Sequence, residues 1–107
     1  MPVAIVADLN LGILTDRQRD AVDAVTRQIK ALGRTSFPDE RQQVVAALLV
    51  AGVELKRVTD RLETQLEAFD KTLRERGTTD QEDDLWIQNL ERLNVMLTVL
   101  GRAKAAI

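Results

Sequence analysis

Four acidic residues close together in the C-terminal third are the strongest candidates for chemistry in this sequence. Carboxylates are common metal ligands, and the four are Asp80, Glu82, Asp83 and Asp84. They lack the residue spacing and the glycine of an EF-hand loop. Carboxylates are also common in the first turn of a helix, where they interact favourably with the positive end of the helix dipole. We therefore interpret the cluster as a helix start and expect no metal site.

The side chains that most often carry catalysis are nearly absent. The 107 residues include no His, Cys or Tyr, and Ser36 is the only serine. This composition excludes thiolate nucleophiles and the common zinc sites. Paired carboxylates for acid–base catalysis would have to come from solvated helix faces, without a pocket or an electrophilic partner. We expect a protein with no enzymatic activity and no cofactor.

The charge and hydropathy of the chain limit the kinds of partner that it is expected to bind and the compartment in which it is expected to act. The net charge of -2 lacks the basic excess of nucleic-acid-binding proteins, so we expect no direct contact with nucleic acid. No run of 18 apolar residues is present, so we expect no membrane span. The N-terminus lacks the positive charges of a signal peptide and carries Asp8. We expect a cytoplasmic location.

Capping signals and apolar spacing predict an all-α fold of three helices. Thr15 followed by Gln18, and Thr79 followed by Glu82, match the capping box that begins a helix. Pro38 suits the first turn of another helix, where a missing amide hydrogen costs little. The predicted helices cover residues 15–33, 38–76 and 79–104 of a single domain, residues 1–107.

The second and third predicted helices form a long antiparallel hairpin. Gly77 is placed to end the second helix, and the third begins almost at once, so the two should be neighbours. Gly33 is placed to end the first helix, which we expect to cover the overhanging end of the hairpin. Gly52 predicts a close helix crossing. Apolar residues at alternating spacings of three and four predict coiled-coil-like packing of the second helix. This seam comprises Val45, Leu48, Gly52, Leu55, Thr59, Leu62, Leu66, Phe69 and Leu73.

The third predicted helix is apolar around most of its circumference. Its apolar arc spans roughly 220° at 100° per residue, which is more than one neighbouring helix can cover. Trp86 can serve as a core residue or as an interface anchor. One part of the arc is a seam against the second helix, formed by Trp86, Leu90, Leu93, Leu97 and Leu100. A second part lies outside this seam and consists of Val95, Met96 and Val99.

The second part of the arc needs another surface. The first helix or the N-terminal arm can bury Val95, Met96 and Val99 within one chain, or a second copy or a foreign helix can bury them at an interface. A chain of this length buries only about 60 to 65% of its unfolded surface when it folds alone. We therefore expect a helical-bundle homodimer, while both ways of covering the three residues are consistent with the sequence.

Residues 1–14 follow a different pattern. Apolar residues alternate there with a more mixed face at period two, which is more typical of an extended segment than of a helix. A lone strand has no partner in an all-helical chain. We expect an apolar arm that lies in a groove or is mobile until a partner arrives.

The segment LNVMLTVLG, residues 93–101, also carries a family resemblance. Its order of Leu93 and Asn94, a hydrophobic block containing Thr98, and then Leu100 and Gly101 resembles the TraM antiactivators of bacterial quorum sensing in rhizobial-type conjugation systems. A long helix begun by proline and a short acidic linker precede this segment. The N-terminal third of the chain has no counterpart that aligns.

The resemblance implies a dimeric helical protein that regulates transcription. Such a protein binds a LuxR-type transcriptional activator and stops it from engaging its promoter DNA. The positions that the resemblance assigns to dimerisation or target contact are Leu93, Asn94, Met96, Leu97, Leu100 and Gly101. The alternative function is a small helical chaperone, which shelters an amphipathic helix of a secretion or assembly client.

Overall fold

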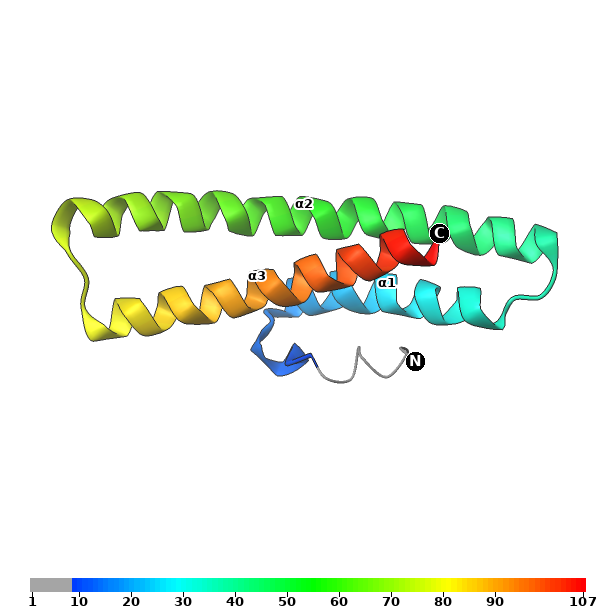
Figure 1. The fold of residues 1–107 in the computed structure, drawn as a ribbon, viewed down its shortest axis with the longest axis horizontal. Helices are drawn as coiled ribbons and strands as arrows, with labels where there is room; N and C mark the ends of the chain where they lie inside the picture. The colour runs from blue at the N-terminus through cyan, green and yellow to red at the C-terminus, as the bar shows by residue number, and fades with distance from the viewer. Residues whose placement is uncertain (1–8) are drawn as a thin grey trace.

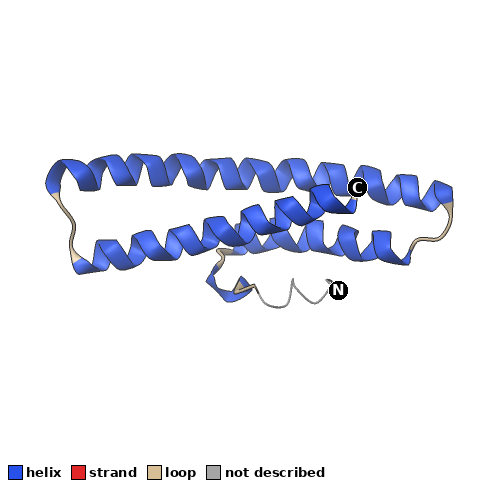
Figure 2. Cartoon of the chain, in the orientation of Figure 1, coloured by secondary structure: helices blue, strands red, loops and turns tan. Residues whose placement is uncertain are grey.

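The computed structural model describes residues 9–107, which form an elongated bundle of three long helices (Figure 1). No strand occurs in this part of the chain (Figure 2), so the predicted all-α class is confirmed. The elements in chain order are the 3-10 helix η2 (Leu11–Ile13), α1 (Asp16–Arg34), α2 (Pro38–Arg76) and α3 (Asp80–Ala106). Each of the long helices begins within one residue of the position predicted from its capping signal.

Local hydrogen bonds explain where the helices begin. The hydroxyl of Thr15 accepts a hydrogen bond from the backbone amide of Gln18 at 3.3 Å. In return, the side-chain oxygen of Gln18 accepts one from the backbone amide of Thr15 at 3.0 Å. Thr79 and Glu82 form the same reciprocal capping box at the start of α3. These bonds pair amides that a helix N-terminus otherwise leaves without partners.

The two glycines predicted to end helices behave differently. Gly77 has a φ of +82°, and its amide donates a hydrogen bond to the Leu73 carbonyl at 2.8 Å. A glycine adopts this backbone conformation without the steric cost that a side chain adds. Gly33 instead lies within α1, which continues to Arg34 with no positive φ. The prediction of a left-handed cap at Gly33 is therefore wrong, because Thr35 ends the helix by donating to the Leu32 carbonyl.

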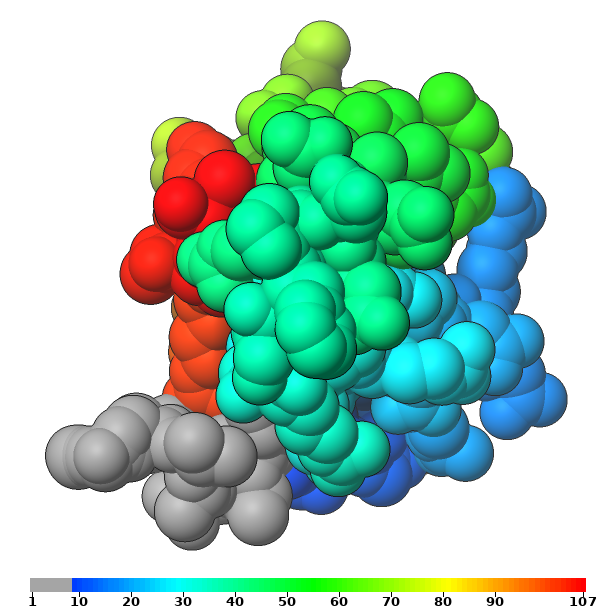
Figure 3. Space-filling view, turned by 90° about the vertical axis from the view of Figure 1, so that its right-hand side faces the viewer, coloured from blue at the N-terminus to red at the C-terminus, as the bar shows by residue number. Residues whose placement is uncertain are grey.

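The longest helix forms the spine of the bundle. Figure 1 shows α1 and α3 lying along α2 and running in the opposite direction to it. The two shorter helices overlap beside the middle of α2, where they also contact each other, and then extend toward opposite ends. Viewed along the bundle, they flank α2 on different sides (Figure 3). The three helices therefore lie side by side only in the middle of the bundle. Toward each end, α2 has one neighbouring helix instead of two.

The predicted seam of α2 points into the core. Leu48, Leu55, Leu62, Leu66 and Leu73 are buried on one side of the helix, together with Thr59. The Thr59 hydroxyl donates a hydrogen bond to the Leu55 carbonyl at 2.7 Å, which satisfies a polar group that would be costly to bury alone. Val45, Gly52 and Phe69 are partly exposed. The α2 seam therefore forms the centre of the hydrophobic core.

The core face of α3 differs from the predicted seam. Met96 is completely buried, whereas Leu90 and Leu97 are 37% and 44% exposed. The prediction of Leu90 and Leu97 as seam residues is wrong, because α3 contacts α1 as well as α2 and turns its core face toward both. The buried residues of α3 are Val95, Met96, Val99 and Ala103.

The same face of α3 is exposed where α1 does not reach. Leu85 precedes Met96 by eleven residues, which is about three helical turns, so the two lie on one face. Leu85 is nevertheless exposed, because it lies near the start of α3, outside the overlap with α1. Burial along α3 is thus decided by the position of α1.

Two further predictions concern Gly52 and the N-terminal segment. Within residues 9–107, no atom of another helix lies within 4 Å of the position that a Cβ on Gly52 would occupy, so the predicted close helix crossing is wrong for this part of the chain. Residues 11–13 form the η2 helix rather than an extended strand, and residues 1–8 lie outside the described residues. The Arg92 guanidinium donates a hydrogen bond to the Ile13 carbonyl at 2.8 Å and attaches this segment to α3, beside the buried Leu14.

Candidate functional site

Large apolar side chains remain exposed on both long helices of the hairpin. They are not scattered singly, because several follow one another at helical spacing on α2 and others on α3. Clustered apolar exposure of this kind marks interaction surfaces. The exposed residues are Leu49, Val50 and Val53 on α2, Leu85, Ile87, Leu90 and Leu97 on α3, and Ile107 at the C-terminus.

The main hollow is an apolar groove between the N-terminal half of α2 and the C-terminal end of α3. Its volume is about 300 Å³. None of its lining residues comes from α1, so it opens on the side of the hairpin that α1 leaves uncovered. Of the described residues, two with charged side chains line it, Lys56 and Lys104. The other lining residues are Leu48, Leu49, Gly52, Val53, Leu100, Ala103 and Ile107.

Two more hollows continue along α2 in either direction. Toward the start of α2, a hollow of about 400 Å³ shares Leu49 with the main groove and is lined by Arg41, Val45 and Ala46. Toward the end of α2, a hollow of about 200 Å³ is lined by acidic residues of α2 and apolar residues of α3. Its residues are Glu63, Leu66, Glu67, Asp70, Trp86, Leu90 and Leu93. Among the lining residues, Arg41 is the charged residue of the first hollow, whereas the last hollow has three carboxylates on α2.

Ten residues of α3 were predicted to lie in its apolar arc or at the contact positions that the resemblance implies, and they divide into three groups. Val95, Met96 and Val99 are buried within one chain, so the option that a second copy or a foreign helix covers them is wrong. Trp86, Leu93 and Leu100 are half-buried and line the hollows described above. The exposed ones are Leu90, Asn94, Leu97 and Gly101.

Two apolar residues on the α2 side of the main groove, Leu49 and Val53, were not predicted from the sequence. Leu49 and Val53 lie beside the predicted seam, and together with Ala46 they repeat at spacings of three and four. This second stripe was a usable signal, because two parallel apolar stripes on one helix indicate two neighbours. Ile107 had no such signal, because its place in the groove depends on where α3 ends against α2.

Trp86 makes an intramolecular aromatic contact. Its ring lies 6.1 Å from that of Phe69, centroid to centroid, with a tilt of 39° between the planes. Aromatic rings at this separation attract each other. The contact joins α2 to α3 beyond the reach of α1 and favours a core role for Trp86 over that of an interface anchor.

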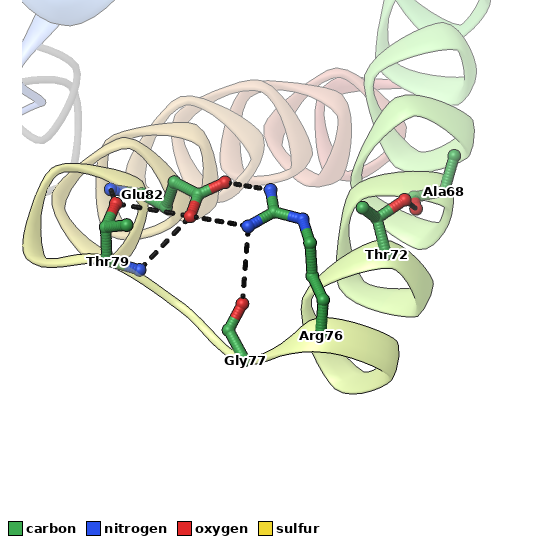
Figure 4. Close-up of polar contacts among 6 residues, drawn as sticks. All are labelled: Ala68, Thr72, Arg76, Gly77, Thr79 and Glu82. Atoms are coloured by element: carbon green, nitrogen blue, oxygen red, sulfur yellow. Dashed lines mark hydrogen bonds and ion pairs between the residues drawn. The ribbon is translucent and has the colours of Figure 1, made fainter.

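The acidic cluster at the start of α3 is part of the α2–α3 turn. Glu82 receives hydrogen bonds from the Arg76 guanidinium and from the Thr79 amide, the latter at 3.1 Å (Figure 4). The Arg76 hydrogen bond is the main reason that the pKa of Glu82 falls from 4.5 to about 2, and the Thr79 amide adds to this shift. Among residues 9–107, no three potential metal ligands lie close enough together to hold an ion. The geometry supports a structural role for Glu82.

We predict that the charge of Glu82 makes stability depend on pH. A carboxyl whose pKa is lower in the folded state stabilises the fold above its unfolded pKa, and this contribution is lost as the pH falls. Glu82→Gln keeps a capping acceptor but removes the charge, so the variant should be less stable than the native chain at pH 7. Urea titrations should show this difference shrinking between about pH 4.5 and pH 2. A difference that stays constant over this range would contradict the prediction.

The fold and its surface define an all-α three-helix bundle with an uncovered apolar groove on one side of a helical hairpin. No protein-family model, curated protein or solved structure matches the chain. None of the helices within residues 9–107 combines the length and the apolar composition that crossing a membrane requires.

Proposed function

We propose that this chain is a non-enzymatic protein-interaction module that binds a LuxR-type transcriptional activator and prevents it from binding promoter DNA. The observation that carries this proposal is the exposure of part of the 93–101 segment, on which the resemblance to TraM antiactivators rests. Asn94, Leu97 and Gly101 are exposed on α3, and Leu90 is exposed one turn before Asn94.

These four residues form one binding stripe on α3. Their spacings of four, three and four residues place them on the same side of the helix. The stripe combines two leucines with an amide that can donate and accept hydrogen bonds, and Gly101 leaves room for a partner to approach closely. Apolar anchors beside a polar group are typical of specific protein interfaces.

Inhibition would follow from stoichiometric binding. The affinity of the protein would be higher for the form of the activator that is unable to engage DNA than for the form that is able to do so. The difference between these two affinities sets the extent of inhibition. No catalytic residue is needed for this mechanism.

The proposal is tested with a purified LuxR-type activator bound to fluorescent promoter DNA. Adding the native chain should release the DNA at about equimolar ratio to the activator. Leu97→Glu should weaken this inhibition at least about tenfold, because it places a charge in the binding stripe. Circular dichroism should show unchanged helix content, since Leu97 is exposed.

Leu85→Glu is the matched control, because Leu85 is exposed on the same helix but lies outside the stripe. It should inhibit as well as the native chain. Complexes that stay intact across a large molar excess of the native chain would contradict the antiactivator role. Protection of an amphipathic client from aggregation, with promoter complexes undisturbed, would instead support the chaperone.

A further inference from the structure

We propose that a second copy of this chain occupies the apolar groove between α2 and α3, with the two α2 helices antiparallel and centred on Gly52. This inference does not rest on the proposed binding of an activator. It follows from three properties of the uncovered side of α2, namely its apolar centre, its opposite charges at the two ends and the free space at Gly52.

The centre of the groove is apolar and exposed. Leu49 and Val53 are 54% and 60% exposed, and Ile107 adjoins them from α3. Burying such side chains against a second copy is favourable by roughly 25 cal/mol per Å² of apolar surface. Lys56 and Lys104 at the rim have long aliphatic stems, which can cover apolar surface while their ammonium groups stay in water.

The charges on either side of this centre complement each other under a two-fold axis. Arg41 lies eleven residues before Gly52, and Glu63 lies eleven residues after it. Eleven residues are about three turns, so all three residues lie on the same side of α2. In an antiparallel pair centred on Gly52, Arg41 of each copy faces Glu63 of the other. A two-fold axis makes this contact twice.

These two charges are available for a partner. Neither Arg41 nor Glu63 forms an ion pair within residues 9–107. The neighbouring Lys56 is already bound to Asp60 at 2.6 Å. A parallel pair would instead place Arg41 beside Arg41 and Glu63 beside Glu63, which repel. The charge pattern therefore selects the antiparallel arrangement.

Gly52 suits the centre of such an interface. Within residues 9–107, no atom other than those of adjacent residues and of the surrounding α2 backbone lies within 4 Å of the position that its Cβ would occupy, although Gly52 lines the groove. A glycine in a helix interior costs about 1 kcal/mol relative to alanine. Close approach of the partner's α2 at the axis gives a reason for a residue that has no packing role within one chain.

The apolar centre is tested by sedimentation equilibrium of the full chain. The native protein should have about twice its 12.0 kDa mass. Leu49→Glu combined with Val53→Glu should raise the dimer dissociation constant at least about thirtyfold. Val50→Glu is the matched control, because Val50 is 73% exposed on the same helix but lines none of the three hollows. It should leave the dimer intact, and circular dichroism should show native helix content in both variants.

The antiparallel register is tested by exchanging the charges. Arg41→Glu and Glu63→Arg should each weaken the dimer about tenfold at low salt, because each creates two like-charge contacts. The double variant should restore native affinity. A monomeric native chain, dissociation by Val50→Glu, or a double variant weaker than either single one would each overturn the proposal. Dimerisation and promoter release are separate measurements, so failure of this inference is distinguishable from failure of the proposed function.

Discussion

Met96→Glu is expected to lower the thermal midpoint of unfolding by about 15 °C or more. The Met96 side chain is completely buried, and Val99 on the next turn is 1% exposed. An unpaired carboxylate at this position would lose its hydration without gaining a partner, at a cost of about 4 kcal/mol or more. A domain of this size has a total stability of about 5–15 kcal/mol, so this loss removes between about a quarter and four-fifths of it, and each kcal/mol lowers the thermal midpoint by about 4–8 °C.

Leu97→Glu is the control for Met96→Glu, because the two residues are adjacent in the sequence and differ in burial. Its thermal midpoint should stay within a few degrees of the native value, since exposed substitutions change stability by less than about 0.5 kcal/mol. Circular dichroism at a fixed protein concentration measures both variants. A native thermal midpoint in Met96→Glu would show that its side chain reaches solvent, contrary to the structure.

Leu55→Ala is expected to give the second largest effect. Leu55 is fully buried in the predicted seam of α2, near the middle of the bundle where all three helices meet. Truncating a buried leucine removes its apolar contacts and leaves a cavity, which costs about 2–5 kcal/mol. Denaturant titration should show a lower midpoint with an unchanged slope, because the unfolded surface stays nearly the same.

Leu85→Ala is the matched control for this substitution. It removes the same atoms from a leucine that is exposed near the start of α3. Its loss of stability should be below about 1 kcal/mol. Equal losses in the two variants would contradict the difference in burial between the middle and the end of the bundle.

The core face of α2 was predictable because its seam is long. The seam comprises nine positions, of which six are buried, so an error at one position does not change the direction of the face. The apolar arc of α3 is shorter, so an error at one or two positions changes which face is predicted to be buried. The heptad spacing of its leucines predicted that Leu90 and Leu97 face the core. The buried residues of α3 are instead Val95, Met96, Val99 and Ala103.

The candidate interaction surface was only partly predictable. The segment 93–101 was identified from its apolar character, and four of the ten predicted residues are exposed. The groove residues Leu49 and Ile107 were missed, because they come from α2 and from the chain end and meet only in the folded bundle. A groove between helices depends on their relative placement, which no single segment of sequence records.

The sequence by itself determined the all-α class, the starts of the three long helices and the end of α2 at Gly77. Capping boxes, Pro38 and Gly77 act through hydrogen bonds and backbone geometry within about one turn, so their effect is readable locally. Only the tertiary structure decided which face of α3 is buried and which side of α2 is left open. Leu85 and Met96 lie on one face of the same helix, yet only Met96, in the later part of α3 that lies beside α1, is buried. Burial depends on the relative positions of three helices, and these are set by their mutual packing rather than by the residue spacing within any one of them.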